Sequence, residues 1–194
     1  LADDVMVNSL DFKKIFKKKF SINPKCIYNP FDKSFIKKKL SSKNEKINFF
    51  KKGYINIISI GRLKDQKDHL TSLKAINILK PDLKVKMIIV GKGENKFLLE
   101  KYININKLNH KVKLAGYKKN PYPFIKKSDI VLLSSKYEGL PNILLEAQFL
   151  KKYIISTNCP TGPKEILLNG RAGDLVEVGD YKKIAQLINI YNKQ

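Results

Sequence analysis

Short apolar runs alternate with segments whose apolar residues recur at helical spacing over most of the chain. The runs predict buried strands at residues 54–60, 85–90, 111–115, 130–133, 153–156 and 174–178. The segments between and after them predict helices at 70–79, 95–106, 121–127, 140–147, 163–168 and 184–191. This alternation predicts an α/β fold with a Rossmann-like, doubly wound parallel sheet of about six strands, covered by helices on both faces.

The first 53 residues break this pattern. Residues 5–8 and 25–28 are short apolar stretches, and 9–20 predicts a helix with Ser9 as its N-cap. Residues 32–52 are polar and lysine-rich without a clear period, so we expect an irregular linker there. The predicted organisation is a short N-terminal unit at 1–30, a linker at 31–53 and the sheet domain at 54–194.

Composition narrows the class of protein. Cys26 and Cys159 are the two cysteines and lack metal-ligand spacing, which predicts no disulfide framework and favours a cytoplasmic protein. No apolar run approaches the roughly 20 residues that a membrane span needs. The net charge of +22 is spread along the chain. Compositional bias or an anionic membrane surface explains it better than nucleic acid, for which no motif is present.

Candidate chemistry gathers in the loops that follow the predicted strands. In parallel sheets, ligands bind beyond the carboxyl ends of the strands. Glycine or polar residues stand there at Gly61-Arg62, Gly91-Lys92-Gly93, Gly116-Tyr117 and 134–142. One such glycine indicates only a tight turn, but four loops of this kind on one edge favour a nucleotide-like ligand.

The stretch from Glu138 to Glu146 gives the sharpest signal. Pro141 suits the first position of a helix, and Gly139 before it permits a ligand to approach the backbone. Free N–H groups at a helix start bind phosphate, and flanking carboxylates accept hydrogen bonds from diols. This layout matches a sugar nucleotide. The alternative from spacing alone is a solvated Glu138 and a Glu146 paired with a surface lysine.

Arg62 and Lys67 form a second constellation. Both lie between a predicted strand and the next helix, where two cations suit a diphosphate. Arginine is scarce in this lysine-rich chain, so Arg62 is the more telling residue. His69, His110 and Cys159 have no sequence partners for metal binding or nucleophilic catalysis, and no Asp-x-Asp motif indicates a metal.

The ordered run of these motifs resembles the retaining family 4 glycosyltransferases. The resemblance covers residues 54 to about 190, and Glu138 and Glu146 match that family's pair of glutamates separated by seven residues. Residues 4–28 resemble the last strand and helix of the family's N-terminal domain. The stretches that carry the resemblance are 59–63 with Lys67, 89–93, 135–147, 156–166 and 173–180.

The family has a GT-B fold, in which two Rossmann-like domains face each other across a cleft. The resemblance implies that this chain is the C-terminal, donor-binding half with a short remnant of the N-terminal domain. It implies that Arg62 and Lys67 contact the donor diphosphate, Glu138 the transferred sugar and Glu146 the ribose. The expected catalytic residues are Glu138, Arg62 and Lys67. The expected donor-binding residues are Gly61, Arg62, Lys67, Gly91, Gly116, Glu138, Gly139, Leu140, Pro141, Asn142 and Glu146.

The resemblance also implies the reaction and its partners. We expect a UDP-linked hexose or N-acetylhexosamine donor, transfer with retention, and no metal or other cofactor. The expected acceptor is a glycan or lipid-linked glycan of surface polysaccharide biosynthesis, reached through the missing N-terminal domain at the inner face of an anionic membrane. The fragment alone is expected to bind donor without transferring sugar. Two alternatives stay open: a sugar-nucleotide epimerase of the same architecture, and a non-catalytic basic module that binds nucleic acid or membrane.

Overall fold

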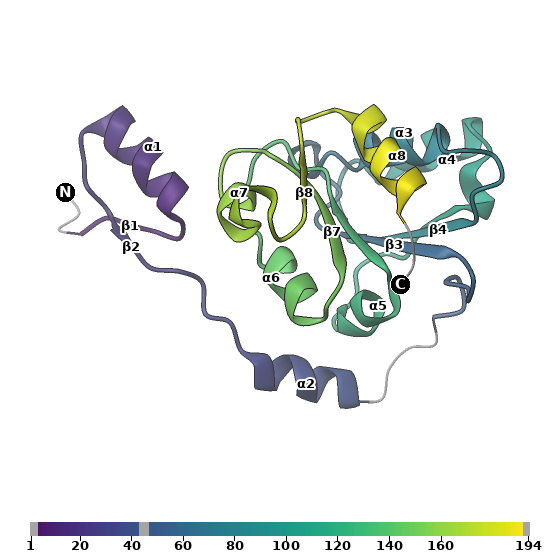
Figure 1. Ribbon diagram of the computed structural model, residues 1–194, viewed down its shortest axis with the longest axis horizontal. Coiled ribbons are helices and arrows are strands. Elements are labelled where there is room, and N and C mark those ends of the chain that lie inside the picture. The colour runs from purple at the N-terminus through teal and green to yellow at the C-terminus, as the bar shows by residue number, and fades with distance from the viewer. Residues whose placement is uncertain (1–3, 43–46, 192–194) are drawn as a thin grey trace.

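The predicted sheet forms as expected in the computed structural model, which describes residues 4–42 and 47–191. Six parallel strands make up one sheet in the order β5-β4-β3-β6-β7-β8 (Figure 1). The Rossmann-like fold class is therefore confirmed. The strands are β3 (Ile55–Ile60), β4 (Val85–Val90), β5 (Val112–Leu114), β6 (Ile130–Leu133), β7 (Tyr153–Thr157) and β8 (Asp174–Val176).

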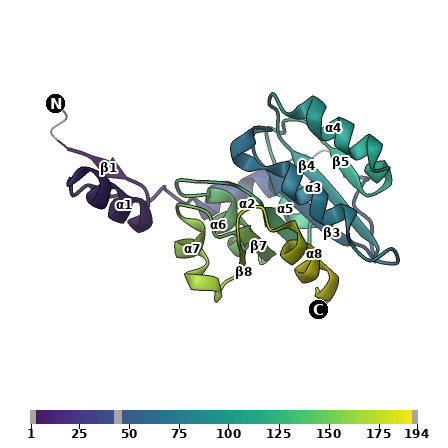
Figure 2. The ribbon, with the colours of Figure 1, turned by 90° about the horizontal axis from the view of Figure 1, so that it is seen from above.

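Helices cover both faces of this sheet, as its alternating apolar side chains require (Figures 1 and 2). One face packs Ile57 and Met87 against α3, α4 and α8, and the other packs Ile58 and Ile88 against α5, α6 and α7. The helices are α3 (His69–Asn77), α4 (Lys96–Ile105), α5 (Tyr122–Lys127), α6 (Asn142–Phe149), α7 (Pro163–Ile166) and α8 (Tyr181–Ile190). Three short 3-10 helices were not predicted: η1 (Asp65–Lys67), η2 (Leu108–His110) and η3 (Leu168–Gly170).

The side of the sheet on which successive strands are added changes between β3 and β6. From β3 the chain adds β4 and β5 on one side, and it then crosses over to add β6, β7 and β8 on the other. Ile57 of β3 pairs with Ile130 of β6 at this junction. Ligands of doubly wound sheets bind in the crevice where the order reverses. The loops after β3 and β6 are therefore the first place to look for a site.

The N-terminal unit lies apart from the sheet (Figures 1 and 2). It consists of β1 (Met6–Val7) paired in parallel with β2 (Lys25–Cys26), and α1 (Leu10–Phe20) between them. The predicted cap is confirmed, because the Ser9 hydroxyl accepts a hydrogen bond from the Phe12 N–H at 3.1 Å. The Glu165 carboxylate of α7 accepts the N–H groups of Leu10 and Asp11 at 3.2 and 3.1 Å. This joins the unit to the sheet domain.

The prediction of an irregular segment at 32–52 was wrong in part, because α2 (Lys33–Ser41) forms there. Asp32 is its N-cap and accepts the Phe35 N–H at 2.9 Å. Ile36 is 2% exposed and anchors the helix. A single strongly buried residue among many lysines gives a weak periodic signal, which explains the error. The boundaries of the domains stay a prediction.

Candidate functional site

Two loops that are about 70 residues apart in sequence are hydrogen-bonded side by side at the crevice. The Gln66 carbonyl of η1 accepts the Lys136 N–H at 2.8 Å, and the Gln66 side chain donates to the Tyr137 carbonyl at 2.9 Å. Beneath them, the buried Ser134 hydroxyl donates to the carbonyls of Lys67 and Asp68 at 3.1 and 2.8 Å. These contacts fix η1 against the loop between β6 and α6.

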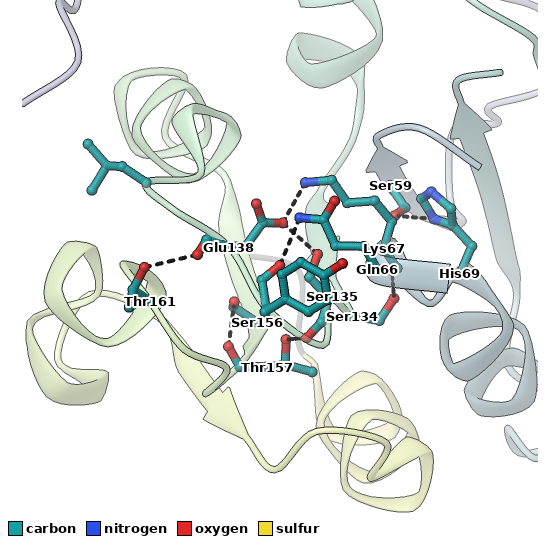
Figure 3. Close-up of polar contacts among 12 residues, drawn as sticks. Ser59, Gln66, Lys67, His69, Ser134, Ser135, Glu138, Ser156, Thr157 and Thr161 are labelled. Atoms are coloured by element: carbon teal, nitrogen blue, oxygen red, sulfur yellow. Dashed lines mark hydrogen bonds and ion pairs between the residues drawn. The ribbon is translucent and has the colours of Figure 1, made fainter. Parts of the chain in front are cut away.

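Lys67 and Glu138, both predicted site residues, meet across this junction (Figure 3). The Lys67 ammonium lies 2.5 Å from Glu138 Oε1, and the Ser135 hydroxyl donates to the same oxygen at 2.6 Å. The side chains are 16% and 7% exposed. A carboxylate so deeply buried needs these partners, because removing a charge from water is costly. The other Glu138 oxygen has no protein hydrogen bond within the described ranges 4–42 and 47–191.

The backbone of Glu138 is held by the loop at 160–161, which belongs to a stretch noted from the sequence but was not among the expected site residues. The Thr161 hydroxyl donates to the Glu138 carbonyl at 2.9 Å (Figure 3). The same hydroxyl donates to the Gly139 carbonyl at 2.9 Å, and the Glu138 N–H donates to the Pro160 carbonyl at 2.6 Å. Gly162 follows with φ +89°, and a Cβ there would lie 2.6 Å from the Gly139 carbonyl oxygen. The positions of Thr161 and Gly162 relative to Glu138 depend on the packing of β7 beside β6, which no local motif reveals.

The start of α6 differs by one residue from the prediction. Pro141 is the N-cap, and Asn142 is the first helical residue. Leu140 is 8% exposed and its side chain packs into the core, so any contact of Leu140 with a ligand would have to come from its backbone. The Asn29 side chain of the N-terminal unit donates to Asn142 Oδ1 at 2.8 Å. The Asn8 amide lies over Gly139, 3.3 Å from where a Cβ would stand.

A cavity of about 420 Å³ lies elsewhere, along the edge strand β5 and helix α4, where Glu100 and Asn104 line it. A second cavity of about 410 Å³ opens at the carboxyl ends of β3 and β4. Both volumes suit a small ligand, but the second has the position at which ligands of such sheets bind. It is lined by Ile60, Gly61, Arg62, Val90, Gly91, Lys92, Tyr117, Lys118, Lys119 and Pro121.

Two of the predicted glycines, Gly61 and Gly91, and Arg62 line this cavity, and Gly116 directly precedes its lining residue Tyr117. A Cβ on Gly91 would stand 1.8 Å from the Gly61 carbonyl oxygen, so the two loops can touch only because Gly91 lacks a side chain. Gly116 has φ +69° and turns the chain into Tyr117. Arg62 lines the cavity with an exposed side chain and lies outside the Lys67–Glu138 contact. Tyr117 was noted from the sequence together with Gly116, but it was not among the expected donor-binding residues.

Glu146 lies just over one turn into α6 and is only partly exposed. The Tyr122 hydroxyl of α5 donates to its Oε1 at 3.2 Å. Burial raises the pKa of Glu146, and the hydrogen bond from Tyr122 opposes that rise. The alternative in which Glu146 pairs with a surface lysine is wrong for the described residues, since the partner is a tyrosine.

His69 and Cys159, the other residues considered for metal binding or nucleophilic catalysis, are both buried. His69 is 3% exposed and its Nδ1 lies 3.1 Å from the Ser59 hydroxyl (Figure 3), and burial lowers its pKa to about 4. Burial raises the pKa of the Cys159 thiol to about 11, which does not suit a nucleophile. Within residues 4–42 and 47–191, no three His, Cys, Asp or Glu side chains cluster as metal ligands, and no helix has the length and apolar character to cross a membrane.

Residues 41–193 match the family described as "Glycosyl transferases group 1". An uncharacterized glycosyltransferase of Methanocaldococcus jannaschii is 37% identical over 174 residues, which are 86% of this chain and 42% of that protein. The N-acetylgalactosamine-N,N'-diacetylbacillosaminyl-diphospho-undecaprenol 4-alpha-N-acetylgalactosaminyltransferase of Campylobacter jejuni is 32% identical over 95% of this chain and 49% of that protein. The chain thus spans less than half the length of these two relatives.

Solved structures share the fold. The crystal structure of Anabaena HepE in complex with UDP and glucose superposes with a TM-score of 0.80 at 21% identity, over 97% of this chain and 53% of that one. A glycosyltransferase from Rickettsia africae superposes with a TM-score of 0.79 at 20% identity, over 96% of this chain and 52% of that one. These likenesses show a shared fold that includes the N-terminal unit.

Proposed function

The chain belongs to the glycosyl transferases group 1 family, and we propose that the cavity at the carboxyl ends of β3 and β4 binds a nucleoside diphosphate sugar. In this proposal the chain is the donor-binding part of a sugar-transferring enzyme. Its named relatives act in capsular, lipopolysaccharide and lipid-linked glycan biosynthesis, which supports the same general role here.

One observation supports the proposal: two residues that line the cavity adjoin the side chains that bind the two glutamates. Gly61 lines it, and a Cβ on Gly61 would lie 3.0 Å from the Lys67 side chain that reaches Glu138. Pro121 lines its other side and precedes Tyr122, which reaches Glu146. A sugar nucleotide has a matching order of base, ribose, diphosphate and sugar.

The proposed contacts follow from the chemistry of each group. Tyr117 and Lys92 border an apolar space that fits a planar base. Glu146 accepts the ribose hydroxyls, and Arg62 and Lys67 neutralise the diphosphate without a metal or another cofactor. The backbone at 139–142 faces the phosphates and sugar, and Glu138 receives hydroxyls of the transferred sugar on its free oxygen.

Lys67 then has two roles. Its ammonium lies 2.5 Å from Glu138 Oε1 and neutralises that carboxylate. A bound diphosphate adds a second anion beside the ammonium. We propose that Lys67 lies between the two anions in the complex and stabilises the charge that develops on the leaving phosphate. Departure of this phosphate on the face that the acceptor attacks would give retention.

The donor is proposed to be a UDP-linked hexose or N-acetylhexosamine. Support comes from a fold relative that was crystallised with UDP and glucose, and from relatives whose names specify N-acetylgalactosaminyl and N-acetylglucosaminyl transfer. The acceptor is proposed to be a glycan or lipid-linked glycan, bound largely by residues beyond this chain. The chain by itself is then expected to bind donor without transferring sugar.

We also propose that the protein associates with an anionic membrane surface. Helix α1 carries five lysines, and Leu10, Phe12, Ile15 and Phe20 on it are 37% to 52% exposed. Basic helices with exposed apolar side chains bind anionic bilayers. Cosedimentation with phosphatidylglycerol vesicles but not with phosphatidylcholine vesicles, lost at high salt, is the expected result; equal sedimentation with both contradicts it.

Calorimetric titration with UDP, GDP, ADP and UDP-sugars tests the donor site. We expect saturable binding of one nucleotide, weakened by about 1–3 kcal/mol in Glu146→Ala and in Arg62→Ala, which is the range for removing one partner of a hydrogen bond and leaving the other unsatisfied. The exposed Arg171 supplies the matched control, and Arg171→Ala is expected to bind like the parent. Parent-like binding in both site variants would show that the residues are assigned wrongly.

The rival classes predict other outcomes. An epimerase would convert the bound sugar nucleotide into its epimer in the absence of any acceptor. A basic module would bind polyanions with a steep dependence on salt and without preference for sugar nucleotides.

A further inference from the structure

Tyr122 stands between the proposed ribose carboxylate and the helix that the sequence did not predict. Its hydroxyl donates to Glu146 Oε1 at 3.2 Å. Its ring meets the ring of Phe35 from α2 edge to face, with centroids 6.2 Å apart and planes at 84°. The C-terminal end of α2 is tied to the same region, because the Asn120 side chain donates to the Lys39 carbonyl at 2.8 Å.

We propose that Tyr122 is a positioning residue for donor binding, which holds the Glu146 carboxylate in the orientation that accepts the ribose hydroxyls. We further infer that α2 keeps Tyr122 in place through Phe35. The inference rests on the proposed function, in which Glu146 binds ribose, and it adds a residue and a helix to that site.

The stereochemistry favours this role. An ionised carboxylate offers about four acceptor positions on its two oxygens. The single donor from Tyr122 occupies one on Oε1 and leaves enough acceptor capacity for two hydroxyls. A side chain on the surface of a helix would otherwise lose rotamer freedom when the ligand binds, at a cost in affinity. The hydrogen bond restricts Glu146 before the donor arrives.

The pKa shifts of Glu146 and Tyr122 also support the positioning role. Burial raises the pKa of Glu146, which favours the neutral acid, and the Tyr122 hydrogen bond lowers it again. Burial and the Glu146 charge raise the pKa of Tyr122 to about 12, so the phenol remains a donor at neutral pH. On α6 itself the residues three and four positions from Glu146 are Asn142, Ile143, Phe149 and Leu150, which are uncharged. Among the described residues Glu146 makes no ion pair.

The test is calorimetric titration of the 194-residue chain with UDP and with ADP, which share ribose and diphosphate, between pH 5 and pH 9. We expect Tyr122→Phe to weaken binding about fivefold at pH 8, a modest loss for a hydrogen bond to a carboxylate. Without the hydroxyl the Glu146 pKa rises. The fall in affinity on acidification should therefore begin at a higher pH in Tyr122→Phe than in the parent.

Tyr153→Phe is the matched control. The Tyr153 hydroxyl also binds a carboxylate, that of Asp174, but at the opposite end of the parallel strands. This variant should keep the affinity and the pH profile of the parent. A Tyr122→Phe variant that behaves like Tyr153→Phe would overturn the positioning role.

Glu146→Gln separates this inference from the proposed function. If neither nucleotide binds the parent, or if Glu146→Gln binds like the parent at every pH, the proposed ribose contact fails and the inference fails with it. If Glu146→Gln binds weakly and Tyr122→Phe binds like the parent, only the role of Tyr122 fails.

A double variant tests whether Tyr122 acts through Glu146. Adding Tyr122→Phe to Glu146→Gln should weaken binding by less than twofold further, because residues that act as a unit are not additive. A full fivefold further loss would instead place Tyr122 in direct contact with the nucleotide.

Phe35→Ala tests the part assigned to α2. Phe35 is 47% exposed, so its removal leaves the core intact. We expect about a twofold loss of affinity, with the pH profile moved in the same direction as in Tyr122→Phe. Parent-like affinity and pH profile would remove α2 from the mechanism and leave Tyr122 alone.

Discussion

The Glu138 side chain is 7% exposed, whereas Tyr117, across the proposed donor site, is 66% exposed. Glu138 receives hydrogen bonds from Lys67 and Ser135, and its backbone is tied to the loop at 160–161. Tyr117 has one described partner near its ring, the Lys92 ammonium at 5.5 Å from the centroid. One side of the site is thus fixed by a buried polar network, and the other is an exposed rim.

The difference follows from what each side is proposed to do. Groups that stabilise developing charge work best when they are oriented before the ligand arrives, since no reorganisation is then needed during the reaction. An exposed aromatic side chain that stacks on a base can order on binding at a modest entropic cost. Changes to the network should therefore affect folding as well as binding, and changes to the rim should affect binding alone.

Among the variants considered, Lys67→Met is expected to cause the largest loss in the free energy of unfolding. It leaves the Glu138 carboxylate buried with the Ser135 hydroxyl as its remaining side-chain partner, and unpaired buried charges are strongly destabilising. We expect a loss of about 3 kcal/mol in the free energy of unfolding, the low end of the range for breaking a buried ion pair, measured by urea denaturation. The double variant Lys67→Met with Glu138→Gln should recover most of it.

The matched control joins the same two segments at the surface. Lys136 forms an ion pair with Asp65 at 2.8 Å, and the side chains are 41% and 86% exposed. Lys136→Met should cost less than about 0.5 kcal/mol, because exposed ion pairs contribute little. Equal losses in Lys67→Met and Lys136→Met would remove the distinction between a fixed side and a rim.

The fixed side should also make stability depend on pH through His69. Burial, with a smaller effect of the Lys67 charge, lowers its pKa to about 4, whereas an unfolded histidine titrates near 6.5. The unfolded chain therefore takes up a proton first as the pH falls. We expect His69 to account for about 2 kcal/mol of stability lost between pH 7 and pH 5.

Urea denaturation of His69→Gln at both pH values isolates this contribution, since the variant should lose less stability than the parent on acidification. His110 is exposed, and His110→Gln should show the same pH dependence as the parent. A parent and a His69→Gln variant that respond identically to pH would mean that His69 is not held in a buried, neutral state.

The sequence was sufficient for the sheet and for most of the helices, because buried strands and amphipathic helices leave periodic signals in the local sequence. It missed α2, whose signals were an Asp32 cap and the spacing of Phe35, Ile36 and Leu40 among lysines. These are typical of a helix that packs by a narrow stripe, and they were masked by the high charge.

The sequence pointed to the charged residues of the candidate site, but not to the residues that hold them in place. Lys67 and Glu138 were expected near one ligand, and the structure brings them together. Tyr122 was not singled out, and Thr161 and Tyr117 lay in stretches noted from the sequence without being assigned to the site, because each contacts a residue of another loop. Their importance depends on strand order and on helix packing across the sheet, which local spacing does not encode.

Tyr117→Ala tests the rim and should have the smallest effect on the fold. Its exposed ring leaves no cavity when it is removed, so we expect no change in the free energy of unfolding beyond about 0.5 kcal/mol. If the ring stacks on the base, UDP affinity should fall by about 1 kcal/mol, at the lower end of the range for base–aromatic stacking. Tyr137, which is 58% exposed on the fixed side, supplies the matched control, and Tyr137→Ala should bind UDP like the parent. A loss of stability in Tyr117→Ala without a loss of UDP affinity would show that the ring contributes to the folded core and that the base does not bind in this cavity. A loss of affinity alone would show that this side of the site contributes to binding and not to folding.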